Sequence, residues 1–425
     1  MVWGDIAIDR AARALFDTRA MERLKGMSEL GFTFASFPRA RHTRFDHALG
    51  VYHLTRLTLK KITDSGAYLE SRDVQGALAA ALLLDVGRYP YSQAVEGIAL
   101  PDVPTFKELS RRWIEHSEVA KVLLSEWDLE PHNIFRLVAR GESPPRNLTP
   151  TEHLLRDILF GSLDVNTLDR LVRDAKGAKV PFGMVEVESL IEHLRIVGQE
   201  NRAILTVDEE AVGSLQSLVF SRYLLHYNVY GHPALRIPTM MFLRAVQDAI
   251  QAGTTTFDKL SEQDDAEAFV SLQDSAESGS STATLLKRLA ERRSYHLALE
   301  FDDRHPNYAS LIRLRDDASW RRRVEEAWSR YLTRYRKGDA GPFDILIDLP
   351  HERKLPVELR LIRQTLPPGE RNPVGWQSLS GMTDDDLQRY HAPLHRIFIA
   401  TADDDLVKSV RRHAEELFTI AEEVG

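Results

Sequence analysis

A segment near residue 80 is apolar on every side and limits how the chain can fold. Residues Val74–Leu84 read VQGALAAALLL, in which Gln75 is the one strongly polar side chain. A helix that is apolar all round must be buried among other elements. We therefore expect this helix at the centre of a helical body, with Asp73 as its N-cap.

The first three-fifths of the chain contains further segments with apolar residues at helical spacing. The predicted helices are 48–62, Trp113–Trp127, Thr151–Leu159, Thr167–Ala175, Val185–His193, Asp208–Asn228 and Leu235–Ile250. One stretch, Leu194–Val207, alternates and predicts a β-hairpin. The polar stretch Ser271–Ser281 predicts a surface loop.

The last quarter of the chain has a different character. Apolar, β-branched segments predict strands at Phe343–Leu349, Val357–Ile362 and Arg396–Ala400. The predicted fold class is mainly α, with a small C-terminal α+β appendage. The expected parts are a helical domain over residues 1–270, a helical connection over 271–339 and the α+β region over 340–425.

Composition removes several classes of chemistry. The 425 residues include no Cys, which excludes disulfides, Cys-bound metals and thiol catalysis, so any transition metal needs His and carboxylate ligands. The 55 Lys and Arg against 63 Asp and Glu give a net charge of −8, which does not indicate binding to nucleic acid through bulk charge. No run approaches the roughly 20 apolar residues of a membrane span. The first residues lack the pattern of a secretory signal, and we expect a cytoplasmic protein.

Three segments combine His, Asp and Arg in a way that points to a shared site. They are Arg41–Gly50 (RHTRFDHALG), Ala81–Gln93 (ALLLDVGRYPYSQ) and Gly161–Asp174 (GSLDVNTLDRLVRD). In this order and spacing they resemble the HD-domain superfamily, most closely its deoxynucleotide triphosphohydrolase branch. Three later segments match the same branch: Phe220–His232, Leu289–Tyr295 and Gly341–Pro350. The resemblance implies the HD helical fold, a phosphohydrolase ancestry and an oligomeric state.

The metal site that the resemblance implies is altered in this chain. The family holds its metal with a His, a consecutive His-Asp pair and a distant Asp. His47 and Asp85 keep two of these positions, but Leu84 replaces the His of the pair and Asn166 replaces the distant Asp. Leu cannot bind a metal, and Asn offers a neutral carbonyl oxygen. We therefore expect no tightly bound transition metal; Mg²⁺ carried by the phosphates of a nucleotide is the easier case.

Five further family positions keep suitable residues. They are Arg44, Glu96, His116, Arg222 and Tyr230. In the family the Arg and His positions contact phosphates, the Tyr lines the sugar pocket, and Glu96 and His116 match catalytic positions. The family's Gly-His and Pro-Phe-Ser-His motifs read here Gly87-Arg88 and Pro90-Tyr-Ser-Gln93. Arg88 can help to hold phosphate, but it cannot generate a metal-bound hydroxide.

Structural roles stay open for several of these residues. His47 and His116 can donate to backbone carbonyls, and Asp85 can be a structural acceptor. Asn166 can cap a helix. Arg222 and Tyr230, two helical turns apart, can pair in the core. Two neighbouring histidines could supply a missing metal ligand, although we expect them at the surface: His42 and His53.

The combination of lost metal ligands and kept phosphate-facing residues favours a catalytically silent protein. It would bind a nucleotide or another phosphorylated small molecule, or act as a regulator or scaffold. One alternative is a metal-dependent nucleoside triphosphate phosphohydrolase with an altered metal site; another is a structural partner of an active paralogue in mixed oligomers. We expect a homo-oligomer. The cations Arg44, Arg88 and Arg222 outnumber Asp85 and Glu96, which favours an anionic ligand.

Overall fold

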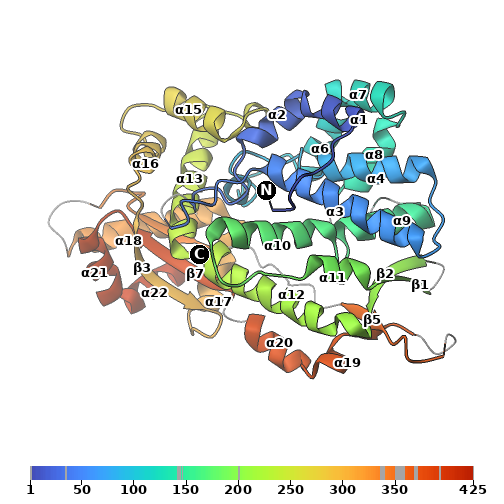
Figure 1. Ribbon diagram of the computed structural model, residues 1–425. Helices are drawn as coiled ribbons and strands as arrows, with labels where there is room; N and C mark the ends of the chain where they lie inside the picture. The colour runs from blue at the N-terminus through green and yellow to red at the C-terminus, as the bar shows by residue number, and fades with distance from the viewer. Residues whose placement is uncertain are drawn as a thin grey trace.

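The apolar segment of the sequence forms helix α4 (Ser71–Leu83), which lies inside the helical body of the computed structural model (Figure 1). Every residue from Gly76 to Leu83 is buried, which confirms the prediction. Helix α4 packs against α3 (Arg44–Asp64), α8 (Pro131–Val138) and α9 (Pro150–Phe160). The predicted cap is wrong: Glu70 is the N-cap, and Asp73 lies three residues into the helix, where its side chain accepts from the Glu70 backbone N–H.

The structure describes residues 2–33, 36–140, 145, 147–199, 202–335, 340–349, 359–367, 372–391 and 394–424. The other helices of the first half are α1 (Arg10–Phe16), α2 (Arg19–Gly26), α5 (Ser92–Val95), α6 (Phe106–Glu115), α7 (Glu118–Glu126), α10 (Val165–Ala178) and α11 (Val187–Glu192). The later helices are α12 (Val212–Leu225), α13 (Pro233–Gln251), α14 (Phe257–Ser261), α15 (Asp265–Ser275), α16 (Ser281–Ala290), α17 (Tyr308–Ile312), α18 (Ala318–Thr333), α19 (Gln377–Ser380), α20 (Asp384–His391), α21 (Asp404–Arg412) and α22 (Ala414–Glu423). The chain is thus mainly helical, as predicted.

Two small sheets accompany the helices. The first has the order β1 (Leu194–Gln199), β2 (Arg202–Asp208), β5 (Arg360–Ile362), β6 (Val374–Gly375), and its β1–β2 pair confirms the predicted hairpin. The second has the order β3 (His296–Asp302), β7 (Arg396–Thr401), β4 (Ile345–Asp348). Strand β3 lies in the segment predicted as a helical connection. Strand β5 pairs with β2, which belongs to the predicted helical domain. Within residues 340–425 β4 pairs with β7 and β5 with β6, but β7 and β5 also pair with β3 and β2 of earlier segments, so both sheets extend beyond this region.

Several predicted elements are interrupted or shorter than expected. The helix predicted over Trp113–Trp127 breaks at Ser117, whose side chain accepts from the Val119 N–H and starts a new helix, α7. The helix predicted over Asp208–Asn228 consists of a 3₁₀ turn η2 (Glu209–Ala211), α12 and a π-helical turn η3 (His226–Tyr230). In the predicted loop 271–281, helices α15 and α16 leave only 276–280 outside a helix. Residues 357–358 of the second predicted strand lie outside the described residues.

The apolar core extends over both parts of the chain. One cluster of buried side chains fills the helical body around α3, α4 and α10, and another lies between the β3–β7–β4 sheet and helices α18, α21 and α22. A third cluster, formed mostly by α13, α15 and α16, joins the two. In Figure 1 α10 lies beside α3, with α12 on its other side. No helix in the described part of the chain is long and apolar enough to cross a membrane.

Candidate functional site

The first turn of α3 directs two site residues into the protein. Thr43 caps this helix, because its hydroxyl accepts from the Asp46 N–H and the Asp46 carboxylate accepts from the Thr43 N–H. Residues three positions apart on a helix share a face. Arg44 and His47 therefore both point inward, and 4% and 0% of their surfaces are exposed. Both of these predicted residues lie in one buried cluster.

Asp85, which follows α4, is surrounded by arginines. Its Oδ2 accepts from Arg44 Nη1 at 2.7 Å, and its Oδ1 accepts from Arg88 Nε and Arg140 Nη2, each at 3.3 Å. Leu84, at the position of the lost His, is fully buried and belongs to the apolar core. Both oxygens of the carboxylate that the family uses for its metal are thus taken by guanidinium groups.

The charges in this cluster shift one another strongly. Burial alone would raise the pKa of Asp85, but Arg44, Arg88 and Arg140 outweigh it and hold this pKa well below its usual range. Glu29 and Asp85 raise the pKa of Arg44 against the effect of its burial. Burial lowers the pKa of Arg140 to about 9, because Asp85 compensates only part of the desolvation. Asp85 is therefore ionised at neutral pH, and its charge holds the surrounding cations.

Besides Arg140, the cluster contains Glu29 and Arg170, which were not predicted from the sequence either. Glu29 is buried, and its Oε1 lies 3.2 Å from Arg44 Nη1 and 3.2 Å from Arg170 Nε. Arg44 and Arg170 lower the pKa of Glu29 although burial acts in the other direction. Glu29 precedes α3 in an irregular segment that carries no periodic signal. Arg170 lies inside the third motif segment, one helical turn after Asn166, and this spacing was a signal that could have found it.

His47 is held by two oxygen acceptors. Its Nδ1 lies 2.7 Å from Asp169 Oδ2, and its Nε2 lies 2.9 Å from Asn166 Oδ1, which also accepts from Arg170 Nη2 at 3.1 Å. Asp169 also accepts two bonds of 2.8 Å from Arg173. Neither ring nitrogen of His47 is directed at open space. The interpretation of Asn166 as a helix cap is wrong, because Asp164 caps α10 and Asn166 lies in its first turn.

These contacts do not fit the metal site that the family implies. A metal ligand needs a lone pair that is directed at the ion, but the side chains of His47, Asp85 and Asn166 direct theirs at protein donors or face another acceptor. No group of three or more His, Asp or Glu side chains in the described ranges is placed to hold a metal ion. The site is organised as a network of ion pairs in which guanidinium groups occupy the neighbourhood of Asp85.

Tyr230 and the predicted surface histidine His42 meet at one carboxylate. The Tyr230 hydroxyl donates to Asp174 Oδ2 at 2.5 Å, and His42 Nε2 lies 2.7 Å from Asp174 Oδ1. His42 is therefore not at the surface; only 10% of its side chain is exposed. Burial and the Asp174 charge raise the pKa of Tyr230 well above its ordinary value, so its hydroxyl keeps its proton and acts as a donor. His53 is half-buried and stacks on Trp3.

The three remaining predicted residues differ from one another in their position relative to the cluster. Glu96 joins the cluster through an ion pair with Arg88. Arg222 is buried with Asp164 as the carboxylate that acts most strongly on its pKa, and it lines neither of the cavities described below. His116 is the C-cap of α6, and 66% of its side chain is exposed beside Glu115. The structure thus unites His47, Asp85, Asn166, Arg44, Arg88, Glu96 and Tyr230, and leaves His116 apart from them.

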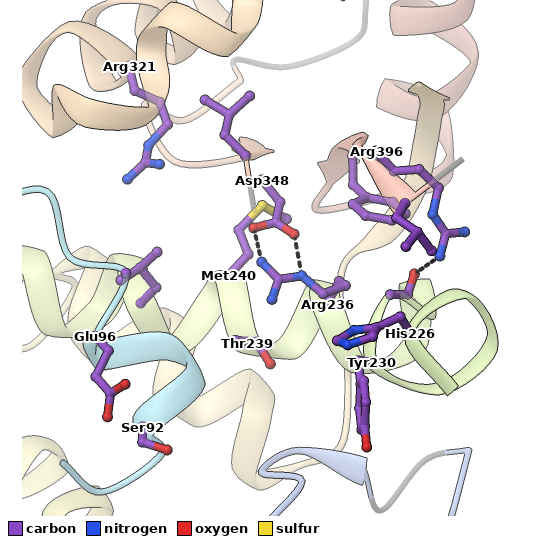
Figure 2. Close-up of a pocket in the computed structure, with 16 residues that line it drawn as sticks. Ser92, Glu96, His226, Tyr230, Arg236, Thr239, Met240, Arg321, Asp348 and Arg396 are labelled. Carbon is purple, nitrogen blue, oxygen red and sulfur yellow. Dashed lines mark hydrogen bonds and ion pairs between the residues drawn. The ribbon is translucent and has the colours of Figure 1, made fainter. Parts of the chain in front are cut away.

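The cluster opens into two adjoining cavities. A small one of about 40 Å³, called here the deep pocket, is lined by Arg44, Arg88, Glu96, Arg170 and Tyr230, among others. A larger one of about 290 Å³, called here the outer cavity, lies between α13, η3, α18, β4 and β7 (Figure 2). Ser92, Glu96 and Tyr230 line both. A phosphate-sized group fits the deep pocket, and the outer cavity has the size of a small-molecule site.

Comparisons with known proteins also find similarity to proteins of the HD type. Residues 185–356 match the model of the HD associated region. A "Deoxynucleoside triphosphate triphosphohydrolase SAMHD1" from Homo sapiens is 26% identical over 306 residues, which cover 64% of this chain and 48% of that protein. An uncharacterized protein, MG461 from Mycoplasma genitalium, is 27% identical over 241 residues, or 54% of this chain and 55% of its own length. The chain thus spans about half the length of these curated relatives.

A solved structure shows the same fold over nearly the whole chain. The crystal structure of a hypothetical protein from Aquifex aeolicus covers 99% of this chain and 97% of its own, with a TM-score of 0.69 and 21% sequence identity. The solved structure shows the fold alone, and the motif segments of this chain resemble those of the HD type. The comparisons confirm that this chain resembles the HD-domain superfamily, on the side of the deoxynucleotide triphosphohydrolases.

The Asp169 network predicts an acid-sensitive fold. Hydrogen bonds from His47 and Arg173 outweigh burial and lower the pKa of Asp169 to about 2. The unfolded chain binds a proton on this group at a higher pH, so stability is present above pH ~4 and is lost as the pH falls towards ~2, by roughly 2 kcal/mol for this group. Urea unfolding across the acidic range should show a shallower loss in Asp169→Asn than in the wild type. The exposed Asp128→Asn should leave the wild-type slope unchanged; equal slopes in all three proteins would contradict the assignment.

Proposed function

We propose that this chain is an HD-domain phosphohydrolase-like protein that binds a nucleotide, or another phosphorylated small molecule, and does not hydrolyse it. One observation carries the proposal: both oxygens of Asp85 are taken by Arg44, Arg88 and Arg140. Guanidinium groups can hold phosphate through paired N–H donors. They cannot supply the metal-bound hydroxide that a metal site generates. The protein therefore keeps a means of holding phosphate and lacks a means of cleaving it.

The partly exposed cations of the deep pocket are the proposed phosphate contacts. Arg88 and Arg170 have 17% and 24% of their side chains exposed, whereas Arg44 is nearly fully buried. Glu29 and Asp85 are themselves buried, and both pair with Arg44. Glu96, with 32% of its side chain exposed, is the partner that a phosphate can displace from Arg88. This exchange is needed because Arg88 is already paired with Asp85 and Glu96 in the structure.

Tyr230 supports the assignment of the deep pocket to a sugar phosphate. Its hydroxyl is fixed by Asp174, and its ring borders both cavities. The sugar would lie against this ring, where the two cavities meet. The human relative is named for its action on deoxynucleoside triphosphates, and this ligand class is the first to test.

Calorimetry provides the test of nucleotide binding. We expect a deoxynucleoside triphosphate to bind with a dissociation constant below millimolar, with or without Mg²⁺. Arg88→Ala should weaken binding by about 1.5–3 kcal/mol, the usual worth of a hydrogen bond to a charged group, and Arg72→Ala, which changes a remote exposed cation, should not. Ribonucleotides, mononucleotides and tripolyphosphate define the selectivity. If no member of this panel binds below millimolar concentration, a structural role beside an active paralogue replaces the proposal.

A further inference from the structure

The outer cavity contains a buried cation that the nucleotide hypothesis does not use. Arg321, on α18, lines the cavity, and only 6% of its surface is exposed. Figure 2 shows its side chain reaching from its helix towards the open part of the pocket, away from the Arg236–Asp348 pair. The structure gives the Arg321 guanidinium no hydrogen bond or ion pair to any residue in the described ranges. A guanidinium group this deeply buried normally has a partner.

The carboxylates near Arg321 already have partners. Asp348 accepts two bonds from Arg236, of 2.8 and 2.7 Å. Glu325 accepts from Arg244 through Oε2 and from the Ile347 N–H through Oε1, the latter at 2.8 Å. Each carboxylate oxygen of Asp348 and Glu325 is thus engaged by another donor, and Arg321 is the cation left over.

The other side chains of the outer cavity leave this cation without compensation. Its remaining carboxylate, Glu96, pairs with Arg88 at the border with the deep pocket. Arg396 pairs with Glu300 and donates to the carbonyl oxygens of Tyr227 and Gly231. Burial lowers the pKa of Arg321, and the charges of Glu325 and Asp348 offset only part of this effect. The charge of Arg321 is therefore costly until an anion enters the cavity.

We propose that the outer cavity is a second anion site, in which Arg321 binds the phosphoryl group of a small phosphorylated molecule. The planar guanidinium can form two parallel hydrogen bonds to one phosphoryl group. An apolar part of the lining can receive the carbon skeleton of the same molecule; it consists of Met240, Leu243, Leu349, Leu394 and Phe398. A volume of about 290 Å³ accommodates a molecule larger than a single phosphate ion. The site is separate from the phosphate contacts proposed at Arg88 and Arg170.

Thermal unfolding of the full chain with inorganic phosphate and with a nucleoside monophosphate tests this site. An anion that binds the native state raises the melting temperature by mass action. The full rise should persist in Arg323→Met, which removes an exposed cation on the same helix. In Arg88→Met, which removes a deep-pocket cation, the part of the rise that comes from the outer cavity should remain. In Arg321→Met the part of the rise that comes from the outer cavity should be lost, together with at least a tenfold weakening of binding at that site in calorimetry. Arg321→Lys keeps the charge without the planar fork and should retain a smaller rise.

Two results would overturn the second site. If phosphate stabilises Arg321→Met as much as the wild type, the anion does not bind at Arg321. If Arg321→Met lowers the melting temperature without phosphate and keeps the full rise with it, Arg321 has a structural role only. Loss of the rise in Arg88→Met alone would assign all phosphate binding to the deep pocket. A larger rise with a dicarboxylate than with phosphate would reject the phosphoryl class. Should Arg321→Met fail to fold, the Arg321→Lys result decides between these outcomes.

Discussion

Replacing Asp85 with Ala is expected to lower the free energy of unfolding by about 3–5 kcal/mol, the usual cost of removing one partner of a buried ion pair. The carboxylate is fully buried and is shared by Arg44, Arg88 and Arg140. Its removal leaves these cations close together, with Glu29 and Glu96 as the carboxylates that still pair with two of them. Urea-induced unfolding, followed by circular dichroism, measures the change.

Two comparison variants make the Asp85 result specific. Asp85→Asn keeps the size and an acceptor oxygen but removes the charge, so its loss should be smaller than that of Asp85→Ala. Asp128→Ala removes a carboxylate that is 91% exposed in its pair with Arg72 and should leave the unfolding midpoint unchanged. A loss below about 1 kcal/mol in Asp85→Ala, typical of a surface ion pair, would show that the arginine cluster does not depend on this residue.

Restoring the two lost ligands is expected not to restore a metal enzyme. In the double variant Leu84→His with Asn166→Asp, the Asp85 oxygens still face three guanidinium groups, and Arg88 still replaces a family His. We therefore expect far less than one bound transition metal per chain and no detectable tripolyphosphate release from deoxynucleoside triphosphates. Elemental analysis and phosphate-release assays measure both. The imidazole introduced at position 84 would also lie in the apolar core, where Leu84 is fully buried, so the variant should be less stable than the wild type.

A variant that also carries Arg88→His and Arg140→Gln is the informative comparison. These changes free the Asp85 Oδ1 from its two guanidinium partners. An increase in bound metal in this fourfold variant, but not in the double variant, would locate the obstacle in the arginines. One metal per chain in the unmodified protein, lost on His47→Ala and accompanied by tripolyphosphate release, would instead establish the metal-dependent phosphohydrolase.

The sequence predicted the helical elements well because their signal is local. The apolar run before Leu84 demands burial whatever surrounds it, and α4 lies in the core. The breaks in predicted helices escaped detection because they depend on single residues: the cap at Ser117 and the π-helical turn before Gly231. The pairing of β3 with β7 was not predicted for a different reason: strands that are far apart in the sequence pair without any local sequence pattern.

The candidate site was predictable only where a motif carried it. His47, Asp85 and Asn166 lie together as their motif positions suggested. Glu29, Arg140 and Arg321 come from segments without such a pattern. Tertiary packing alone brings Glu29 and Arg140 to the cluster around Asp85 and Arg321 to the outer cavity. Charge counting from the sequence therefore missed the Glu29 carboxylate and also the cations Arg140 and Arg170. It also missed the one cation without a partner among the described residues of the outer cavity, Arg321.

The shared wall of the two cavities has a thermodynamic consequence. Ser92, Glu96 and Tyr230 face both the deep pocket and the outer cavity. A ligand that moves Glu96 or Tyr230 in one compartment changes the surface that the other compartment offers. Any resulting cooperativity is reciprocal, because the coupling free energy is the same whichever compartment is filled first.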